Sequence, residues 1–180
     1  MLEGIYFFII GAFIGWILEC VFKYITKNFK RTPGILNTPF CILYGLGTVA
    51  LSLVIGRITN NFLSAFILSM IVLSIMEYIT FVLLKKIYNV ELWNYNNMTF
   101  NINEKVCLEF SFVWGLLGAL YIKYLLPMFR SFFITSMSFA FKVALVLILG
   151  IIVVDFIYSS YVLIKSKKKL ESVETEKVKI

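Results

Sequence analysis

Carboxylates interrupt several of the long apolar stretches in this sequence. Glu19, Glu77 and Asp155 each lie inside such a stretch, and Glu109 opens another. If these stretches are helices that cross a membrane, a charge at the centre of one costs about 2.5–3.5 kcal/mol to insert. We therefore expect the three inner carboxylates to face the inside of a helix bundle or a water-filled vestibule. Glu19 and Glu77 either line a pathway or form structural bonds, such as one between Glu19 and Lys23. For Asp155 we favour a structural role or a pair with a lysine.

A second set of polar side chains lies in the connection between residues 85 and 107. Aromatic residues alternate there with asparagines, which supply hydrogen-bond donors and acceptors without charge. Such aromatics favour the membrane interface, so the segment is either an interfacial loop or a cytoplasmic plug, substrate lip or docking surface. Its candidate site residues are Trp93, Asn94, Tyr95, Phe100 and Asn101.

Residues for several other kinds of chemistry are missing. The sequence contains no histidine, and its cysteines, Cys20, Cys41 and Cys107, form no CxxC pair. Catalytic triads and zinc sites that need histidine are therefore excluded. No GxxxxGKS/T phosphate loop occurs either, so the sequence carries no P-loop ATPase of its own. We expect no catalytic residue, no metal site and no cofactor.

The elements that position these residues follow from composition. Of the 180 residues, 61% are hydrophobic and 15% are charged, whereas soluble domains are nearer half apolar and a quarter charged. Apolar runs of about 20 residues predict an all-α, polytopic transmembrane helix bundle of about five spans. These cover residues 4–25, 40–58, 62–84, 108–129 and 139–164. The span 40–58 is short and glycine-rich, so it either crosses the membrane or forms a re-entrant segment.

The basic residues predict the orientation of this bundle. Thirteen of the 17 Lys and Arg residues, including Lys30, Arg31 and Lys179, fall in the first and third connections and the tail. The other four are Arg57, Lys123, Arg130 and Lys142. Because cytoplasmic loops carry the excess of positive charge, we expect the N-terminus outside and the C-terminus in the cytoplasm. Residues 1–165 then form a single transmembrane domain and residues 166–180 a charged cytoplasmic tail. Anionic lipid, rather than nucleic acid, is the expected partner of these charges.

Two further expectations come from this topology. At 1.5 Å per residue, Glu19, Glu77 and Asp155 lie roughly 9–14 Å inside their predicted inner helix ends and therefore share one level. Small residues at spacings typical of close helix contacts predict the packing surfaces, either within one chain or between chains. The glycines concerned are Gly11, Gly15, Gly45, Gly47, Gly115 and Gly118.

The sequence also contains a weak parallel repeat. Glu19 is followed by basic residues, Cys41 and a Tyr44-Gly45-Leu46-Gly47 motif. Glu77 is followed in the same order by basic residues, Cys107 and Trp114-Gly115-Leu116-Leu117-Gly118. Many transporters are built from such duplicated units.

These motifs resemble those of a bacterial membrane-protein family, the putative ABC-transporter type IV (CmpB-like) family. The resemblance extends from about residue 4 to residue 125 and rests on short, ordered motifs. They are Phe13-Ile14-Gly15-Trp16 with Glu19, Pro39-Phe40-Cys41 with Tyr44-Gly45-Leu46-Gly47, Glu77-Tyr78-Ile79-Thr80, Trp93 with Tyr95, Phe100-Asn101 with Cys107, and Ser111 with Trp114-Gly115. The chain departs from the family pattern at Ile42, Asn94, Glu104 and Lys105, where the family favours proline, aspartate, glycine and arginine. The aspartate missing at position 94 weakens any mechanism that needs a carboxylate there.

The resemblance implies a permease-type subunit of the bacterial cytoplasmic membrane that transports an unknown substrate. Energy would then come from a separate ATPase subunit or an ion gradient. Five spans are few for a complete pathway, so a homo- or hetero-oligomer is expected. The alternatives are a non-transporting accessory protein that organises lipid or a partner complex and, less favoured, a lipid-modifying membrane enzyme that uses its carboxylates.

Overall fold

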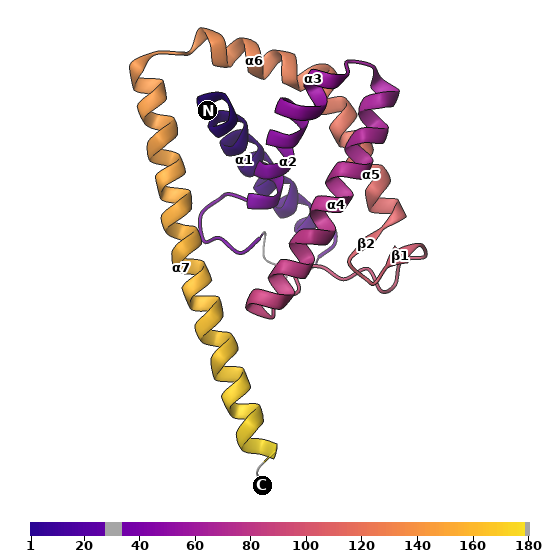
Figure 1. Cartoon of the computed structure of the whole chain (residues 1–180), viewed down its shortest axis with the longest axis vertical. Helices are drawn as coiled ribbons and strands as arrows, with labels where there is room; N and C mark the ends of the chain where they lie inside the picture. The colour runs from indigo at the N-terminus through magenta and orange to yellow at the C-terminus, as the bar shows by residue number, and fades with distance from the viewer. Residues whose placement is uncertain (28–33, 179–180) are drawn as a thin grey trace.

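The computed structural model describes residues 1–27 and 34–178, and within this part the chain is built from helices and one small hairpin. Lys30, Arg31 and Lys179, which entered the charge argument, lie outside the described residues. The helical segments, in chain order, are α1 (Leu2–Ile25), α2 (Ile42–Ala50) continued by η1 (Leu51–Ile55) and α3 (Gly56–Ile58), α4 (Phe62–Tyr88), α5 (Leu108–Leu120) continued by η2 (Tyr121–Leu125) and α6 (Leu126–Thr135), and α7 (Phe139–Val178). The predicted all-α transmembrane bundle is confirmed (Figure 1).

Four of these segments are long and apolar enough to cross a membrane. They are Leu2–Ile25, Phe62–Tyr88, Leu108–Thr135 and Phe139–Leu170. The remaining segment, Ile42–Ile58, is a shorter apolar helix. At 1.5 Å per residue it is about 25 Å long, less than the roughly 30 Å of a typical hydrocarbon core. This segment corresponds to the predicted span 40–58. Its length leaves open both alternatives, a complete crossing and a re-entrant segment.

Several helices continue past the boundaries expected from hydropathy. Helix α4 continues past Leu84 and ends at Tyr88. The next residue, Asn89, adopts a left-handed conformation (φ 57°) that commonly ends helices. Helix α7 runs through to Val178, so it contains most of the segment assigned to the charged tail. Because lysine and glutamate are good helix formers, a run of these residues can end an apolar stretch while the helix itself continues.

The connection between the last two long helices is itself helical. The segment that begins with α5 extends to Thr135, beyond the predicted end at Phe129. Pro127 stands at the start of α6, where its missing N–H is tolerated. Figure 1 shows α6 running across one end of the molecule toward α7, and the two termini lying at opposite ends.

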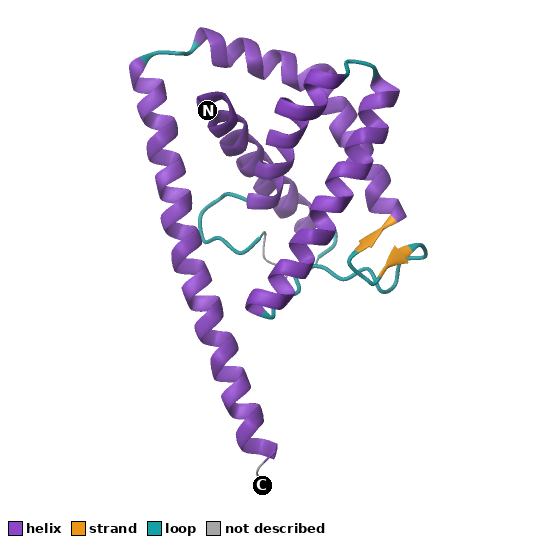
Figure 2. Ribbon diagram, in the orientation of Figure 1, coloured by secondary structure: helices purple, strands orange, loops and turns teal. Residues whose placement is uncertain are grey.

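The small hairpin lies between α4 and α5. Strands β1 (Asn101–Ile102) and β2 (Val106–Cys107) pair antiparallel, with Asn101 opposite Cys107 (Figure 2). Asn103 and Glu104 in its turn both have positive φ. The connection that the sequence described only as polar and aromatic is thus a folded unit.

Buried apolar side chains gather where α1 meets η1, α6 and α7. Members of this core include Tyr6, Phe7, Leu51, Ile55, Leu126, Leu145 and Ile152. The ring of Tyr6 contacts those of Phe133 and Phe141 at centroid distances of 5.1 and 6.0 Å. This core joins α7 to the other helices at the end opposite the hairpin.

Candidate functional site

The bundle has two halves, one that begins with the pair α1–α2 and one that begins with the pair α4–α5. Close helix contacts repeat in these two halves. A Cβ on Gly11 of α1 would lie 2.0 Å from Oγ1 of Thr48 on α2, so no larger residue fits there. A Cβ on Gly118 of α5 would lie 2.3 Å from Cβ of Ser69 on α4. A shift of 58 residues along the sequence (69 − 11) takes Gly11 to Ser69, and a shift of 70 residues (118 − 48) takes Thr48 to Gly118. The contact is therefore the same one, with its small residues exchanged.

A second contact obeys the same two shifts. A Cβ on Gly45 would lie 2.8 Å from the ring of Phe8, and one on Gly115 would lie 2.9 Å from the ring of Phe66. The pair α1–α2 thus corresponds to the pair α4–α5. The π-helical segments η1 and η2 also occupy equivalent positions. These contacts support the internal repeat and place the packing glycines between helices of one chain.

The two remaining packing glycines lie beside the boundary between the halves. A Cβ on Gly15 would lie 2.2 Å from Cβ of Tyr44. A Cβ on Gly47 would meet Cδ2 of Leu73, on α4 in the other half, at 3.1 Å. The absence of side chains at these positions lets an aromatic residue and an opposing helix approach closely.

The carboxylates Glu19 and Glu77 occupy equivalent positions in the two halves. The hydroxyl of Tyr44 donates to Oε1 of Glu19 at 2.9 Å. The indole N–H of Trp114 donates to Oε2 of Glu77 at 2.9 Å. The shifts that relate the glycine contacts also take Glu19 to Glu77 and Tyr44 to Trp114. Each half therefore supplies one carboxylate and one aromatic donor.

An additional donor reaches Glu77 from the hairpin connection. The hydroxyl of Tyr95 donates to Oε1 of Glu77 at 2.7 Å, and the Glu77 side chain is buried at 3% exposure. The rings of Tyr44 and Trp114 meet edge to face with their centroids 5.5 Å apart. A continuous network therefore runs from Glu19 through Tyr44 and Trp114 to Glu77 and Tyr95. We call these five residues the carboxylate–aromatic network.

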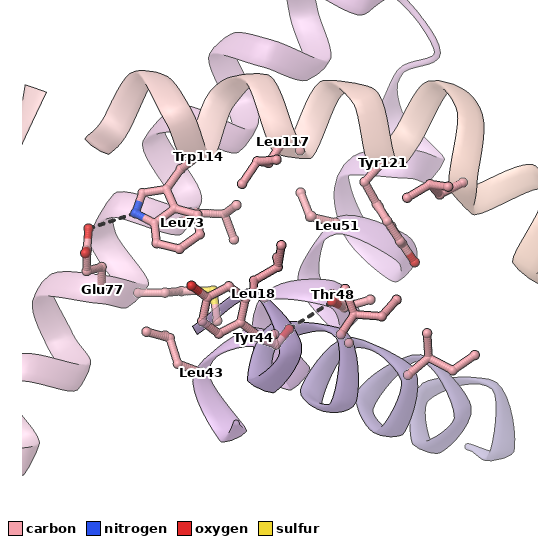
Figure 3. Close-up of a pocket in the computed structure, with 18 residues that line it drawn as sticks. Leu18, Leu43, Tyr44, Thr48, Leu51, Leu73, Glu77, Trp114, Leu117 and Tyr121 are labelled. Carbon is pink, nitrogen blue, oxygen red and sulfur yellow. Dashed lines mark hydrogen bonds between the residues drawn. The ribbon is translucent and has the colours of Figure 1, made fainter. Parts of the chain in front are cut away.

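A pocket of about 150 Å³ lies between the two halves beside this network. Figure 3 shows Trp114, Leu117 and Tyr121 extending toward the facing segment that carries Tyr44 and Leu51. Glu77 lies at the end of the pocket near Trp114 (Figure 3). An adjoining space of about 250 Å³ is lined by both carboxylates and by Tyr44, Trp93, Tyr95 and Trp114. Glu19 and Glu77 are thus brought to one site.

The predicted loop residues divide between this site and the molecular surface. Tyr95 and Trp93 turn inward: Trp93 donates its indole N–H to the carbonyl of Lys105 at 2.9 Å and packs edge-on against Phe81. Only Tyr95 bonds to a carboxylate of the site.

The other loop residues hold the hairpin together or lie exposed. Asn94 donates to Oε2 of Glu104 at 3.1 Å, and Asn101 accepts from the backbone N–H of Glu104 and donates to the carbonyl of Met98. Phe100 is 74% exposed. The carboxylate beside Asn94 is therefore supplied by Glu104, from the opposite side of the turn.

Asp155 does not join Glu19 and Glu77. Its carboxylate accepts from the side-chain amide of Asn37 at 2.9 Å and from the backbone N–H and hydroxyl of Thr38 at 2.7 and 2.6 Å. Ser159, one turn later on α7, also donates to it. In the described part of the chain no lysine lies within ion-pair distance of Asp155. This carboxylate attaches α7 to the connection before α2.

Polar contacts also join the two halves at the end of the bundle near the N-terminus. Glu3 pairs with Arg57 and Arg130, each at 3.5 Å. Arg130 donates to the carbonyl of Ser52 in η1, and the Ser52 and Tyr121 hydroxyls lie 2.7 Å apart between η1 and η2. No sequence motif points to these contacts, because they join residues on different helices that lie far apart in the sequence.

The two buried cysteines stand at the N-terminal ends of helices. Cys41 directly precedes α2 and Cys107 directly precedes α5, and neither thiol caps its helix with a side-chain hydrogen bond. Burial raises the pKa of the Cys107 thiol, which disfavours the reactive thiolate. Within the described residues, no group of three Cys, Asp or Glu side chains is placed to hold a metal ion.

Sequence reasoning named the two carboxylates and Tyr95 but missed the other two donors, Tyr44 and Trp114. Tyr44 and Trp114 were noted only as parts of the repeated glycine motifs, and Lys23 was suggested as the partner of Glu19. Their aligned positions in the repeat were the available signal. A donor from a different helix cannot be chosen from spacing along one helix alone.

Comparison with known proteins gives a match to one family. The family model described as "Putative ABC-transporter type IV" matches residues 6–160, which include both halves and most of the apolar part of α7. No curated protein and no solved structure matches the chain significantly. With four helices long and apolar enough to span a membrane, the chain is a membrane protein and belongs to the putative ABC-transporter type IV family.

Proposed function

We propose that this protein is the permease-type subunit of a transporter in a bacterial cytoplasmic membrane. Family membership supports a role in transport. The residues of the site favour binding over catalysis, since aromatic donors engage both carboxylates. The orientation, with the N-terminus outside, is part of this proposal.

The carboxylate–aromatic network is the observation that carries the proposal. It lies in the apolar part of the bundle, at the boundary between two equivalent halves, and it borders the pocket. Transporters built from repeats hold their substrates at the interface between repeats, so that relative movement of the halves can change access. The pocket between the halves is the corresponding place in this protein.

The energy source is proposed to be a separate chain. The sequence contains no phosphate-binding loop, so an ATPase would have to bind as another subunit. Because the basic connections and the hairpin belong to the proposed cytoplasmic side, that side is where an ATPase would dock. A gradient-driven transporter would need no such subunit.

Tagged purification in a mild detergent tests this proposal. Mass spectrometry of the purified material should reveal a nucleotide-binding subunit in stoichiometric amount, absent from an unrelated tagged membrane protein. The ATPase rate of the complex is then compared between wild type, Glu77→Gln and the control Gly150→Ala. We expect Glu77→Gln alone to change the rate while the subunits still co-purify. Recovery of the chain without any ATPase would contradict the ABC-type assignment.

One observation favours a second candidate, a non-transporting accessory protein. Only 11% of the most apolar stretch of α7 is buried against the rest of the chain, so most of this helix is available to lipid or a partner. A stable complex with another membrane protein, without an ATPase and without solute flux in reconstituted vesicles, would support this alternative.

A further inference from the structure

The interior of the pocket offers almost nothing to a hydrophilic ligand. Its three hydroxyl groups bond within the protein: Tyr44 donates to Glu19 at 2.9 Å, Thr48 donates to the carbonyl of Tyr44 at 2.9 Å, and Tyr121 pairs with Ser52 at 2.7 Å. Aliphatic side chains, among them Leu51, Leu73 and Leu117, form most of the remaining wall. A polar molecule placed here would lose its hydration without gaining hydrogen bonds, which is strongly unfavourable.

Polar groups gather at one end of this space. The carboxylates of Glu19 and Glu77 line the adjoining space, together with Tyr95 and two tryptophans. A molecule with an apolar body and a polar head would therefore fit in one direction, with its head toward the carboxylates. Sites for small molecules commonly combine a mainly apolar wall with a few polar groups that set orientation.

The apolar part of the space is elongated and open to the surroundings. On the α5–η2 segment the lining extends from Trp114 to Leu125, which corresponds to about 16 Å along a helix axis. Three lining leucines remain partly exposed, namely Leu18 (40%), Leu117 (40%) and Leu125 (41%). These residues lie in apolar helices, so the exposed side of the pocket faces membrane lipid.

We infer that the pocket between the halves binds part of one alkyl chain of an amphiphile that enters from the membrane. The chain would lie along Leu51, Leu73 and Leu117, with the polar head toward the carboxylate–aromatic network. Beside two carboxylates the fitting head carries an ammonium group, as in phosphatidylethanolamine, whereas the anionic head of a free fatty acid would be repelled there. Binding of the amphiphile does not depend on the function proposed above. Its transport as cargo would rest on that proposed function.

Photochemical labelling tests the inference on the purified chain. The probes are phosphatidylethanolamine and, for comparison, a fatty acid, each with a diazirine in the middle of an alkyl chain, added to protein in nanodiscs of unlabelled phosphatidylcholine. We expect saturable labelling of peptides that contain Leu51, Leu73 or Leu117 by the phosphatidylethanolamine probe, and weaker labelling by the fatty acid. Equal saturable labelling by both probes would overturn the placement of the head beside the carboxylates. Labelling confined to exposed positions such as Val154 on α7, rising linearly with probe, would overturn the inference.

A matched pair of variants separates the pocket from the lipid-facing surface. Leu117→Trp places a large ring in the pocket, whereas Leu116→Trp adds the same ring at an exposed neighbouring position outside it. Loss of contact with about two methylene groups already corresponds to roughly tenfold in binding. We therefore expect Leu117→Trp to lower saturable labelling about tenfold and Leu116→Trp to leave it unchanged. Equal labelling in two folded variants would also overturn the inference.

The labelling result is independent of the co-purification result. Saturable labelling without an ATPase would retain the alkyl-chain site and remove the transporter assignment. An ATPase complex without saturable labelling would retain the transporter assignment and remove the alkyl-chain site. If Leu117→Trp does not fold, the labelled peptides of the wild-type protein still decide the question.

Discussion

At the level of single residues, the environment of Glu77 shows how a carboxylate is accommodated among apolar helices. Both carboxylate oxygens accept a hydrogen bond, one from Tyr95 and the other from Trp114. Tyr95 comes from the hairpin connection and Trp114 from α5, so the carboxylate links three parts of the chain. Hydrogen bonds to a charged group contribute more than those between neutral groups.

Replacement of Glu77 by glutamine should therefore destabilise the protein. The amide retains one acceptor but directs an NH₂ group at the other donor, which removes a bond worth about 1.5–3 kcal/mol. We expect the melting temperature in detergent to fall by about 3–12 °C, followed by tryptophan fluorescence. The control is Glu109→Gln, whose carboxylate is exposed and bonds to Thr99 at the surface. Equal melting of the two variants would contradict the proposed bonding of Glu77.

Asp155 is expected to act on the attachment of α7. Because its oxygens accept from the backbone N–H of Thr38, an asparagine there should weaken this bond and expose the amide. Hydrogen exchange of a peptide covering residues 34–41 should become faster in Asp155→Asn. Tyr158→Phe, on an exposed face of the same helix, is the control and should exchange like wild type. Unchanged exchange in both variants would show that Asp155 does not hold this connection.

At the level of elements, the glycines differ in what surrounds them. A Cβ on Gly118 would lie 2.3 Å from Cβ of Ser69, whereas a Cβ on Gly150 meets nothing within 4 Å. Gly118→Ala should cost about 1–3 kcal/mol through overpacking, and Gly150→Ala should be neutral or stabilising because alanine favours helix. Thermal unfolding of both variants measures the difference.

A compensating change checks the cause of that effect. Ser69→Gly removes the atoms that the new methyl group would strike, so it should restore part of the stability lost in Gly118→Ala. If the double variant melts at or below the temperature of Gly118→Ala, steric contact between α4 and α5 is not the reason for the loss.

The elements show which features of the fold could be predicted from sequence. Apolar runs located every long helix, because membrane insertion depends on summed hydrophobicity, which composition reports directly. The helices extend beyond the expected spans, as at Leu84 and Phe129, because helix geometry continues where hydrophobicity stops. The π-helical segments η1 and η2 were not predicted, since hydropathy does not distinguish a π-helical from an α-helical turn.

The site could be predicted only in part for a related reason. Glu19 and Glu77 stood out because a charge in an apolar segment is unfavourable and therefore conspicuous. Asp155 carried the same signal but bonds elsewhere, because Asn37 and Thr38 lie on a connection whose path hydropathy does not specify. Depth along a helix was a weak criterion, since it says nothing about which face of the helix a residue occupies.

At the level of the whole molecule, the two halves place α1 and α4 in parallel and α7 outside the repeat. The polar contacts of Glu3, Arg57 and Arg130 close one end of the boundary between the halves, and the carboxylate–aromatic network stands at the other. A protein of this design has chemically different ends. Its orientation in the membrane therefore decides which of them meets the cytoplasm.

Cysteine labelling decides this orientation, because the native cysteines all fall on the proposed cytoplasmic half and provide an internal control. An impermeant maleimide applied to right-side-out vesicles should leave wild type unlabelled and should label Asn60→Cys, at the exposed turn before α4. Ser172→Cys, exposed near the end of α7, should react only after the vesicles are permeabilised. The physical reason is the excess of lysine and arginine on the side of Ser172, which resists translocation. The reverse pattern, with Ser172→Cys labelled in intact vesicles and Asn60→Cys protected, would invert the orientation and move any ATPase-docking surface to the end that carries Glu3 and Arg130.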